Sequence, residues 1–388
     1  MEKWNPDLFY KAGYSLTALS AVSIPTIFYD HIAIHPVLPL AMSGFTALYW
    51  KVGLADLNQK DHTLRKNFPF LIHMRYLLES IRPEIQQYFI ESDSDASPFS
   101  RSMRSVIYQR SKAQTDTTAL GTRRNVYKEG YEWGMHSMFP KDHHDVQTRV
   151  MVGLPENGCR QPYSASILNI SAMSYGALSG PAIESLNRGA ARGGFYHNTG
   201  EGGISKFHLC GGDLVWNLGT GYFAAGKTVD GVRKFNPEMF KANASRENVK
   251  MIEIKLSQGA KPAHGGILPA NKITPEIADA RGLGPGPWTE DCASPPSHDS
   301  FDSPLKMMDF IRELRELSGG KPIGFKLAIG SPVEFCALVH AMIEKDVYPD
   351  FITIDGAEGG TGGEFYDNKN GDTRFDFDFV LNEADPTN

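Results

Sequence analysis

The sequence predicts a parallel α/β domain, preceded by a helical region and an apolar amino-terminal hairpin. From Ser166 onward, short apolar segments alternate with helical stretches, which is typical of parallel strands joined by helices. Several motifs rich in glycine and small residues end these segments, so we expect them to share one rim of the sheet. The predicted strands are residues 167–170, 194–197, 214–218, 251–256, 323–327 and 351–354.

Three helices are predicted between the strands, at residues 181–192, 304–317 and 332–345. Each begins close to a proline, whose fixed backbone dihedral suits the first helical turn. Together with the strands they make about six strand-helix positions.

The composition is that of a folded protein and argues against nucleic-acid binding. Of the 388 residues, 41% are hydrophobic and 22% are charged, and the formal net charge is -6. The basic residues are scattered rather than gathered into a patch, so we expect no nucleic-acid partner.

The four cysteines lie far apart and form no CxxC pair, so the sequence shows neither a zinc site nor a local iron-sulfur motif. Nothing marks the chain as secreted, and we interpret the cysteines as reduced and mostly structural, with a disulfide as the alternative. They are Cys159, Cys210, Cys292 and Cys336.

Residues 1–55 contain two closely spaced apolar runs, at 14–29 and 32–50, which predict a membrane hairpin. Basic residues flank the pair and none lies in the connection, which by the positive-inside tendency places both ends in the cytoplasm. A signal peptide fits less well, because Tyr29 and Asp30 follow the first run where a small-residue cleavage site would be needed. The alternative is a hydrophobic helical pair packed on the domain or on a partner.

Residues 56–150 are amphipathic and charged, and we expect them to be largely helical. Apolar residues between 71 and 81 predict a helix that ends at Pro83, and the Ser- and Asp-rich stretch 92–100 predicts a loop. The Asp-His-His-Asp cluster at 142–145 has metal-ligand residue types. Adjacent loop residues rarely converge on one ion, so we favour a solvated turn there and assign no metal ligands.

Two loops near the start of the sheet are built from small residues. Ala172, Met173 and Ser174 end the first predicted strand, where their backbone can approach a flat ligand; a simple turn into a helix is the alternative. The second loop, NTGEGG at 198–203, has little side-chain bulk around Glu201. It is suited to placing this carboxylate over a ligand, with a solvated loop glutamate as the alternative.

The motif QGAKPAHGG at 258–266 follows the strand predicted at 251–256. Lys261 is held between glycines and a proline and can grip a carboxylate or phosphate, while Gln258 can both donate and accept, as a flavin pyrimidine edge requires. His264 is a candidate general acid, although a loop histidine is more often only solvated.

The motif GFKL places Lys326 inside an otherwise apolar strand. Burying an ammonium group without a partner is costly, so an inward Lys326 implies a nearby anion, and beside a flavin it would stabilise negative charge on the ring. The alternative is an outward lysine that reaches solvent. The last motif, DGAEGGTGG, begins at Asp355 and Gly356, and its glycines leave backbone amides free to line a ligand.

Read in order, the motifs AMSYGALS, NTGEGG, IKLSQGAKPAHGG, GFKL and DGAEGGTG resemble the synthase domain of glutamate synthase. They are most similar to its stand-alone FMN-binding relatives, which lack the amidotransferase domain. The resemblance covers nearly all of the chain from Asp61 to Gly362. It implies a TIM-type (β/α)8 barrel that binds FMN and acts as an oxidoreductase on CH-NH2 donors. It also implies reductive formation of glutamate from 2-oxoglutarate and ammonia-derived nitrogen through 2-iminoglutarate.

The resemblance also implies roles for individual residues. Catalysis would involve Glu201 in ammonia addition or proton transfer, Lys261 in substrate binding, and Lys326. The residues implied to bind FMN are Ala172, Met173, Ser174, Asn198, Thr199, Gln258, Lys326, Asp355, Gly356, Gly359 and Gly360.

After Gly362 the chain departs from the family pattern, and residues 364–388 form a polar tail that looks unrelated. We therefore expect residues 151–363 to form an incomplete barrel with about six of its eight strand-helix units. Such a barrel would leave its first and sixth strands with unpaired edges, hold FMN weakly or not at all, and lack the family's [3Fe-4S] cluster. A second chain supplying the missing strands is a predicted partner, besides 2-oxoglutarate, glutamate and the membrane.

Two rival functions belong beside this prediction. One is a membrane-anchored scaffold or catalytically incomplete fragment, which an apo, aggregation-prone protein would favour. The other is an FMN barrel oxidoreductase that acts on a different oxo acid, which substrate screening would distinguish.

Overall fold

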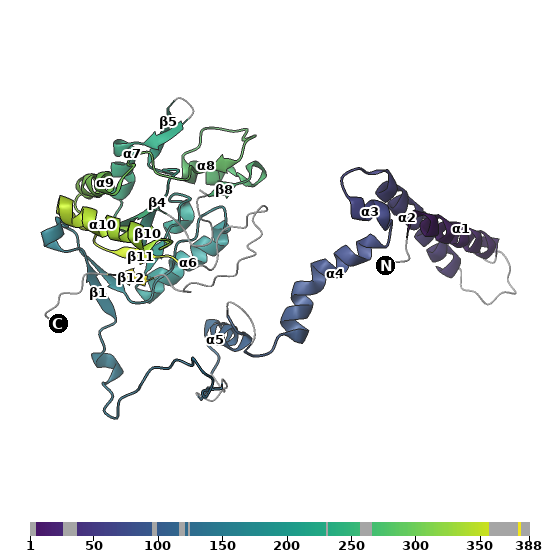
Figure 1. Ribbon diagram of the computed structural model, residues 1–388, viewed down its shortest axis with the longest axis horizontal. Coiled ribbons are helices and arrows are strands. Elements are labelled where there is room, and N and C mark those ends of the chain that lie inside the picture. The colour runs from purple at the N-terminus through teal and green to yellow at the C-terminus, as the bar shows by residue number, and fades with distance from the viewer. Residues whose placement is uncertain are drawn as a thin grey trace. The chain divides into compact units, whose positions relative to one another are not determined.

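The computed structural model describes residues 5–25, 37–94, 99–115, 121–122, 125–229, 232–256, 266–356 and 379–381. The chain forms two compact units, Met1–Trp133 and Gly134–Asn388, and each is described by itself (Figure 1). The described helices of the first unit are α1 (Pro6–Ser23), α2 (Val37–Asn58), α3 (Thr63–Asn67), α4 (Ile72–Ile85), the π-helical turn η2 (Gln86–Ile90) and α5 (Arg101–Ser111).

Helices α1 and α2 pack against each other as an antiparallel pair. The Tyr49 hydroxyl donates to the Phe9 carbonyl at 2.8 Å, and the two rings stack with centroids 4.8 Å apart. Towards the other end of the pair, the hydroxyls of Ser20 and Thr46 lie 2.8 Å apart. Residues 26–36, which join the helices and include the predicted break, lie outside the described ranges.

Among the helices within the described ranges, α2 is the one long and apolar enough to cross a membrane, with a mean hydropathy of 1.2. Large apolar side chains of α2, including Leu38, Leu40 and Leu48, are exposed rather than packed in a core. Length and composition are weak evidence for a span, because core helices of soluble proteins meet the same criteria.

The helix predicted to end at Pro83 continues past it. Helix α4 contains Pro83 and leads directly into the wider turn η2, so the prediction of a helix end at this proline was wrong. A proline inside a helix removes one N–H donor and its ring crowds the carbonyl four residues earlier, yet the helical backbone continues through Pro83 into η2.

The second unit is an α/β structure built on a curled six-stranded sheet in the order β12-β11-β10-β7-β4-β3. The five strands from β3 to β11 pair in parallel, so the sheet is about half of a TIM-type barrel and the predicted fold class is confirmed. The strands are β3 (Tyr196–Asn198), β4 (Asp213–Leu218), β7 (Val249–Lys255), β10 (Ile323–Leu327), β11 (Ile352–Ile354) and β12 (Phe379–Leu381).

Helices cover the outer face of this sheet (Figure 1). They pack on alternate strand residues such as Trp216, Ile254 and Phe325, and the Trp216 ring stacks on Phe240 of α7. Helices α9 and α10 match their predicted bounds, and α6 matches within one residue at each end. The helices of this unit are α6 (Gly180–Gly193), α7 (Pro237–Ala244), α8 (Pro275–Arg281), α9 (Pro304–Leu317) and α10 (Pro332–Lys345).

A hairpin packs against the interior of the sheet near the amino-terminal ends of its strands. Val152, Tyr163 and Ala165 of the hairpin form a cluster with Met251 and Phe351. The hairpin consists of β1 (Arg149–Val152) and β2 (Tyr163–Ser166); two further described pairs are β5 (Gly226–Val229) with β6 (Val232–Phe235) and β8 (Ile267–Leu268) with β9 (Cys292–Ala293). The short 3-10 turns are η3 (His143–Asp145), η4 (Pro155–Asn157), η5 (Lys206–His208) and η6 (Ala270–Lys272).

The strand predicted at 167–170 is reduced to a single parallel bridge between Ile170 and His197. Its other backbone donors are used elsewhere, because the Ile167 N–H donates to Thr148 and the Leu168 N–H donates to the Ser166 hydroxyl. The Asn169 side chain accepts the next N–H of the ladder, that of Tyr196. Two side-chain oxygens, those of Ser166 and Asn169, thus accept backbone N–H groups here, and a regular strand does not form.

The edge of β11 is paired, contrary to the expectation for the sixth strand. Residues 379–381 of the tail form β12 and pair antiparallel with β11, with Thr353 opposite Val380. An edge strand presents a row of backbone donors and acceptors, and even a short apolar segment of the tail can satisfy them.

Candidate functional site

The site lies on the inner face of the sheet, towards the carboxyl ends of its strands. The buried Glu253 carboxylate on β7 accepts hydrogen bonds from Asn198 on β3, Asn217 on β4 and Thr353 on β11, at 2.8, 2.6 and 2.7 Å. Side chains from four strands can meet in this way only on the concave side. Since strand side chains alternate between faces, Lys255 shares the inner face with Glu253.

Lys326 also points inward and forms an ion pair at the rim. It stands in register with Lys255 and Thr353 on the neighbouring strands, so it belongs to the same face. Its ammonium nitrogen lies 2.9 Å from the carboxylate of Asp355, and only 6% of its side chain is exposed. The prediction of an inward lysine beside an anion is confirmed, and its part in catalysis stays a prediction.

A second ion pair lies beside the first. The Lys255 ammonium is 3.2 Å from Glu201 Oε1, and both side chains are largely buried. Two glycines hold the carboxylate closely, because a Cβ on Gly266 would lie 2.8 Å from Glu201 Oε1 and one on Gly219 would lie 2.8 Å from the Glu201 Cβ. Among the described residues, the rim therefore carries two adjacent ion pairs, each with one cation and one anion.

The loop before Glu201 lies directly on the Met173 and Ser174 backbone. Gly200 has a φ of +64°, and a Cβ there would lie 2.6 Å from the Met173 carbonyl carbon and from the Ser174 nitrogen. Only glycine fits such a close approach in this conformation. The structure thus brings together the first two predicted loops, including Asn198 and the fully buried Thr199.

A buried histidine supports the carboxyl end of β7. The ring of His298 donates through Nε2 to the Lys255 carbonyl at 2.9 Å, and its Nδ1 lies 2.9 Å from the Tyr222 hydroxyl. Burial lowers the pKa of His298 to about 4, so the ring is neutral at pH 7. Burial also raises the pKa of Tyr222 to about 12.

Two more buried histidines flank the loop that carries Glu201 in the chain, His197 on β3 before it and His208 in η5 after it. The rings of His197 and His208 are 5.3 Å apart and fully buried. Desolvation lowers the pKa of His197 to about 4 and that of His208 to about 3. Both rings are therefore neutral at physiological pH.

The described residues include part of the predicted site. Glu201, Lys326, Asp355 and the Ala172–Ser174 segment lie within the described structure, as does Gly356, which follows Asp355. The predicted residues that lie outside the described ranges are Gln258, Lys261, His264, Gly359 and Gly360.

The sequence did contain a signal for two rim residues that the prediction missed. Glu253 and Lys255 are charged residues at alternate positions of an otherwise apolar strand, which is the pattern that drew attention to Lys326. Asn217 and Thr353 carried no comparable signal, because an uncharged polar residue in a strand has many ordinary roles.

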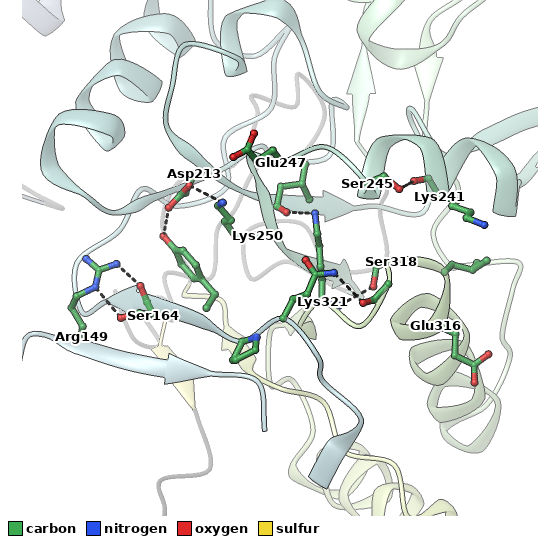
Figure 2. Close-up of a pocket in the computed structure, with 16 residues that line it drawn as sticks. Arg149, Ser164, Asp213, Lys241, Ser245, Glu247, Lys250, Glu316, Ser318 and Lys321 are labelled. Atoms are coloured by element: carbon green, nitrogen blue, oxygen red, sulfur yellow. Dashed lines mark hydrogen bonds and ion pairs between the residues drawn. The ribbon is translucent and has the colours of Figure 1, made fainter. Parts of the chain in front are cut away.

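A hollow of about 960 Å³ lies at the opposite end of the strands (Figure 2). Asp213, Lys250 and Lys321, within two residues of the starts of β4, β7 and β10, are among its lining residues. The Lys321 ammonium group donates hydrogen bonds to the carbonyls of Ala244, Arg246 and Val249. Barrel enzymes place their chemistry at the carboxyl ends of the strands, so this hollow is not the candidate active site.

The cysteines and the Asp-His-His cluster are not partners in the two ion pairs of the rim. All four cysteines are free thiols, of which Cys159 is buried and Cys336 exposed. Asp142, His143 and His144 are exposed at the turn η3, with their possible ligand atoms within 4.8 Å of one another.

Comparisons with known proteins agree with the sequence motifs. A sequence model of the family described as "Conserved region in glutamate synthase" matches residues 132–370, more than half of the chain. The glutamate synthase large subunit-like protein YerD of Bacillus subtilis is 34% identical over 364 residues, which cover 82% of this chain and 67% of YerD.

Two further relatives match over shorter stretches. The archaeal glutamate synthase (NADPH) of Archaeoglobus fulgidus is 36% identical over 196 residues, covering 50% of this chain and 34% of that protein. A glutamate synthase large subunit-like protein of Rhizobium meliloti is 30% identical over 228 residues, covering 58% and 46%. The chain thus spans about a third of the length of the archaeal relative and about two thirds of the Bacillus one.

Proposed function

Because the chain belongs to the glutamate synthase family, we propose that it is an FMN-dependent oxidoreductase that forms glutamate from 2-oxoglutarate and ammonia-derived nitrogen. The observation that carries the proposal is the pair of adjacent ion pairs, Lys255 with Glu201 and Lys326 with Asp355, at the carboxyl ends of parallel strands. This is the end at which barrel enzymes hold their reactive groups.

The chemistry of the rim fits a flavin. Lys326 supplies an inward ammonium group at the rim, and the segment at Met173 and Ser174 offers backbone close to a glycine loop with little side-chain bulk. These residues, with Asn198, Thr199 and Asp355, would hold FMN. When bound, FMN would supply the hydride for reduction of a carbon–nitrogen double bond, and Lys326 would stabilise negative charge on the ring.

Glutamate formation then has two steps, formation of an imine and its reduction. Ammonia adds to the keto carbon of 2-oxoglutarate, and loss of water leaves 2-iminoglutarate. A hydride and a proton then convert the imine to glutamate. Glu201 is the group we assign to accept the proton that the attacking nitrogen must lose, since a carboxylate held at a fixed position is an effective proton acceptor. Cations at the rim would bind the substrate carboxylates, and the family resemblance assigns the same role to Lys261.

The test uses the full-length protein in detergent or lipid, supplied with FMN reduced chemically so that no electron donor need be known. Incorporation of 15N-ammonium into glutamate from 2-oxoglutarate is the expected result, and Glu201→Gln should reduce it about 100-fold. Lys250→Met, at the opposite end of β7, is the matched control and should keep wild-type turnover. No labelled glutamate from the wild-type protein, or turnover with another oxo acid alone, would contradict the proposal.

We also propose that α1 and α2 attach the protein to the membrane with the barrel on the cytoplasmic side. The apolar length of α2 and its exposed leucines support this location, as does the absence of basic residues between the two predicted apolar runs. Fractionation tests it: the protein should sediment with membranes and be released by detergent but not by high salt. Recovery of the full-length chain in a high-speed supernatant without detergent would contradict the proposal.

A further inference from the structure

We propose that Glu253 is a positioning residue that fixes the backbone next to Glu201 through the side chain of Asn198. The carboxylate of Glu253 is 2% exposed and accepts the Asn198 amide N–H at 2.8 Å. The other end of that amide, Asn198 Oδ1, accepts the Gly200 N–H at 3.1 Å. Glu253 thus acts on Gly200, and through it on Glu201, without touching either residue.

The direction of the Asn198 amide follows from the chemistry of its partners. A carboxylate can only accept hydrogen bonds, and the Gly200 N–H can only donate. Asn198 must therefore turn its NH2 towards Glu253 and its oxygen towards Gly200. If the amide were flipped, its oxygen would face the Glu253 carboxylate and its NH2 would face the Gly200 N–H, and neither contact could form a hydrogen bond. Glu253 therefore selects a single orientation of the Asn198 amide.

Strand β7 consequently holds Glu201 in two ways. Lys255, two residues along from Glu253 on the same face, pairs directly with the Glu201 carboxylate at 3.2 Å. Glu253 holds the preceding backbone through Asn198 and Gly200. The ion pair with Lys255 positions the Glu201 carboxylate, and the contacts through Asn198 position the backbone at Gly200, next to Glu201.

The other two donors to Glu253 lock the carboxylate in place. Asn217 shares Oε1 with Asn198, and the Thr353 hydroxyl donates to Oε2. Because these donors come from β4 and β11, the carboxylate is tied to strands on both sides of β7. Its position, and therefore that of Asn198, is set by the sheet rather than by the loop.

Glutamine at this position should preserve the function, whereas leucine should not. In Glu253→Gln the side-chain oxygen can keep both asparagine donors, and its NH2 can donate to Thr353, whose hydroxyl accepts as well as donates. Leucine of similar size offers no acceptor, which frees the Asn198 amide to rotate. A catalytic role for the charge itself would instead make glutamine as harmful as leucine.

The primary measurement is hydrogen exchange of the peptide that spans residues 198–203, followed by mass spectrometry on the full-length protein. Glu253→Leu and Asn198→Ala should each speed exchange of the Gly200 amide about tenfold, the factor produced by about 1.4 kcal/mol of lost bonding. Glu253→Gln should leave it unchanged. Thr353→Val is the matched control: it removes a different donor from the same carboxylate and keeps the hydrogen bond from Asn198, so it should speed exchange of the Gly200 amide less than Glu253→Leu does.

The double variant decides whether the two residues act in one chain of contacts. Glu253→Leu with Asn198→Ala should exchange no faster than Asn198→Ala alone. Additive effects, an unchanged Gly200 amide in Asn198→Ala, or equal acceleration by Thr353→Val would each overturn the proposal. If Glu253→Leu does not fold, Glu253→Ala, which leaves room for water, takes its place.

An effect of Glu253 on catalysis rests on the role proposed for Glu201. The positioning role of Glu253 and the proposed function can nevertheless be tested separately. In the glutamate-forming assay, Asn198→Ala and Glu253→Leu should lower kcat about tenfold while Glu253→Gln keeps it. A wild-type protein without turnover would end the proposed function but leave the exchange result standing. Unchanged exchange in the variants of an active enzyme would end the positioning role alone.

Discussion

The ammonium group of Lys255 lies 3.2 Å from the carboxylate of Glu201, although the two residues are 54 positions apart in the chain. Lys255 ends β7, and Glu201 lies in the glycine-rich loop that follows β3. The contact gives the loop carboxylate a fixed partner on the sheet. Several properties of the rim that can be measured depend on pairs of this kind.

Lys255→Met should lower glutamate formation about tenfold or more, because Glu201 loses the cation that holds it at the rim. Lys255→Arg should retain part of the activity, since it keeps the charge but not the shape of the pair. The measurement is initial rate with reduced FMN and saturating substrates. Equal rates for Lys255→Met and the wild-type protein would show that the ion pair has no part in turnover.

Lys326→Ala should weaken reduction of bound FMN. The variant removes an inward ammonium group that lies 2.9 Å from Asp355, and with it the positive charge available to a reduced ring. Photoreduction of the FMN-loaded protein, with a reference dye to report the potential, measures the effect as a shift to a lower potential. Unchanged photoreduction would count against an inward lysine beside the flavin.

Gly200→Ala should destabilise the sheet unit by about 2 kcal/mol or more. Its left-handed φ alone costs an alanine about 1–2 kcal/mol, and the added Cβ would press on the Met173 and Ser174 backbone. Gly189→Ala is the contrasting variant, because Gly189 lies inside α6 with open space around it. That change should stabilise the protein by about 0.5–1 kcal/mol.

Urea unfolding of both glycine variants, followed by circular dichroism, provides the comparison. The two substitutions add the same methyl group, so opposite signs would isolate the effect of local geometry. Two variants of equal stability would be inconsistent with the close approach at Gly200.

Stability should fall as the pH is lowered from about 6.5 towards 4. Burial depresses the pKa of His197, His208 and His298 to about 4, 3 and 4, below their ordinary value of 6.5. Between pH 6.5 and about 4, these histidines therefore bind protons in the unfolded chain but stay neutral in the folded chain. The stabilising contribution is complete above pH 6.5, shrinks as the pH falls, and is lost once the folded histidines also protonate.

Each histidine should account for a loss on the order of 2 kcal/mol over this range. Urea midpoints at pH 7.5, 6, 5 and 4 test the prediction, and His197→Phe should flatten the curve in proportion to its share. A stability that is level between pH 7.5 and 5 would contradict neutral, buried histidines in the fold.

Much of the sheet could be predicted because its signal is local. Residues 323–327 read as a strand because apolar side chains alternate with Gly324 and Lys326, and the structure has β10 at the same bounds. Prolines at 304 and 332 begin α9 and α10, since a proline fits the first helical turn without losing a hydrogen bond. The same reasoning failed at Pro83, where the rest of α4 outweighed one missing donor.

Cross-strand contacts were beyond this kind of prediction. Asn198, Asn217 and Thr353 are ordinary polar residues in sequence, and nothing local shows that all three donate to Glu253. The strand expected at 167–170 failed for a related reason, because the Asn169 side chain took a place in the ladder that the backbone pattern alone assigned to a strand.

The sequence by itself determined the alternation of strands and helices, the presence of a lysine inside the apolar strand β10 and the glycine-rich motifs that follow the strands. These follow from the two-residue period of strands and from the conformational freedom of glycine, which act over a few residues. Only the tertiary structure decided that Lys255 pairs with Glu201, that Glu253 accepts hydrogen bonds from side chains on three other strands, and that β12 pairs with β11. Such contacts depend on strand order and register, which are set by packing between segments distant in the chain.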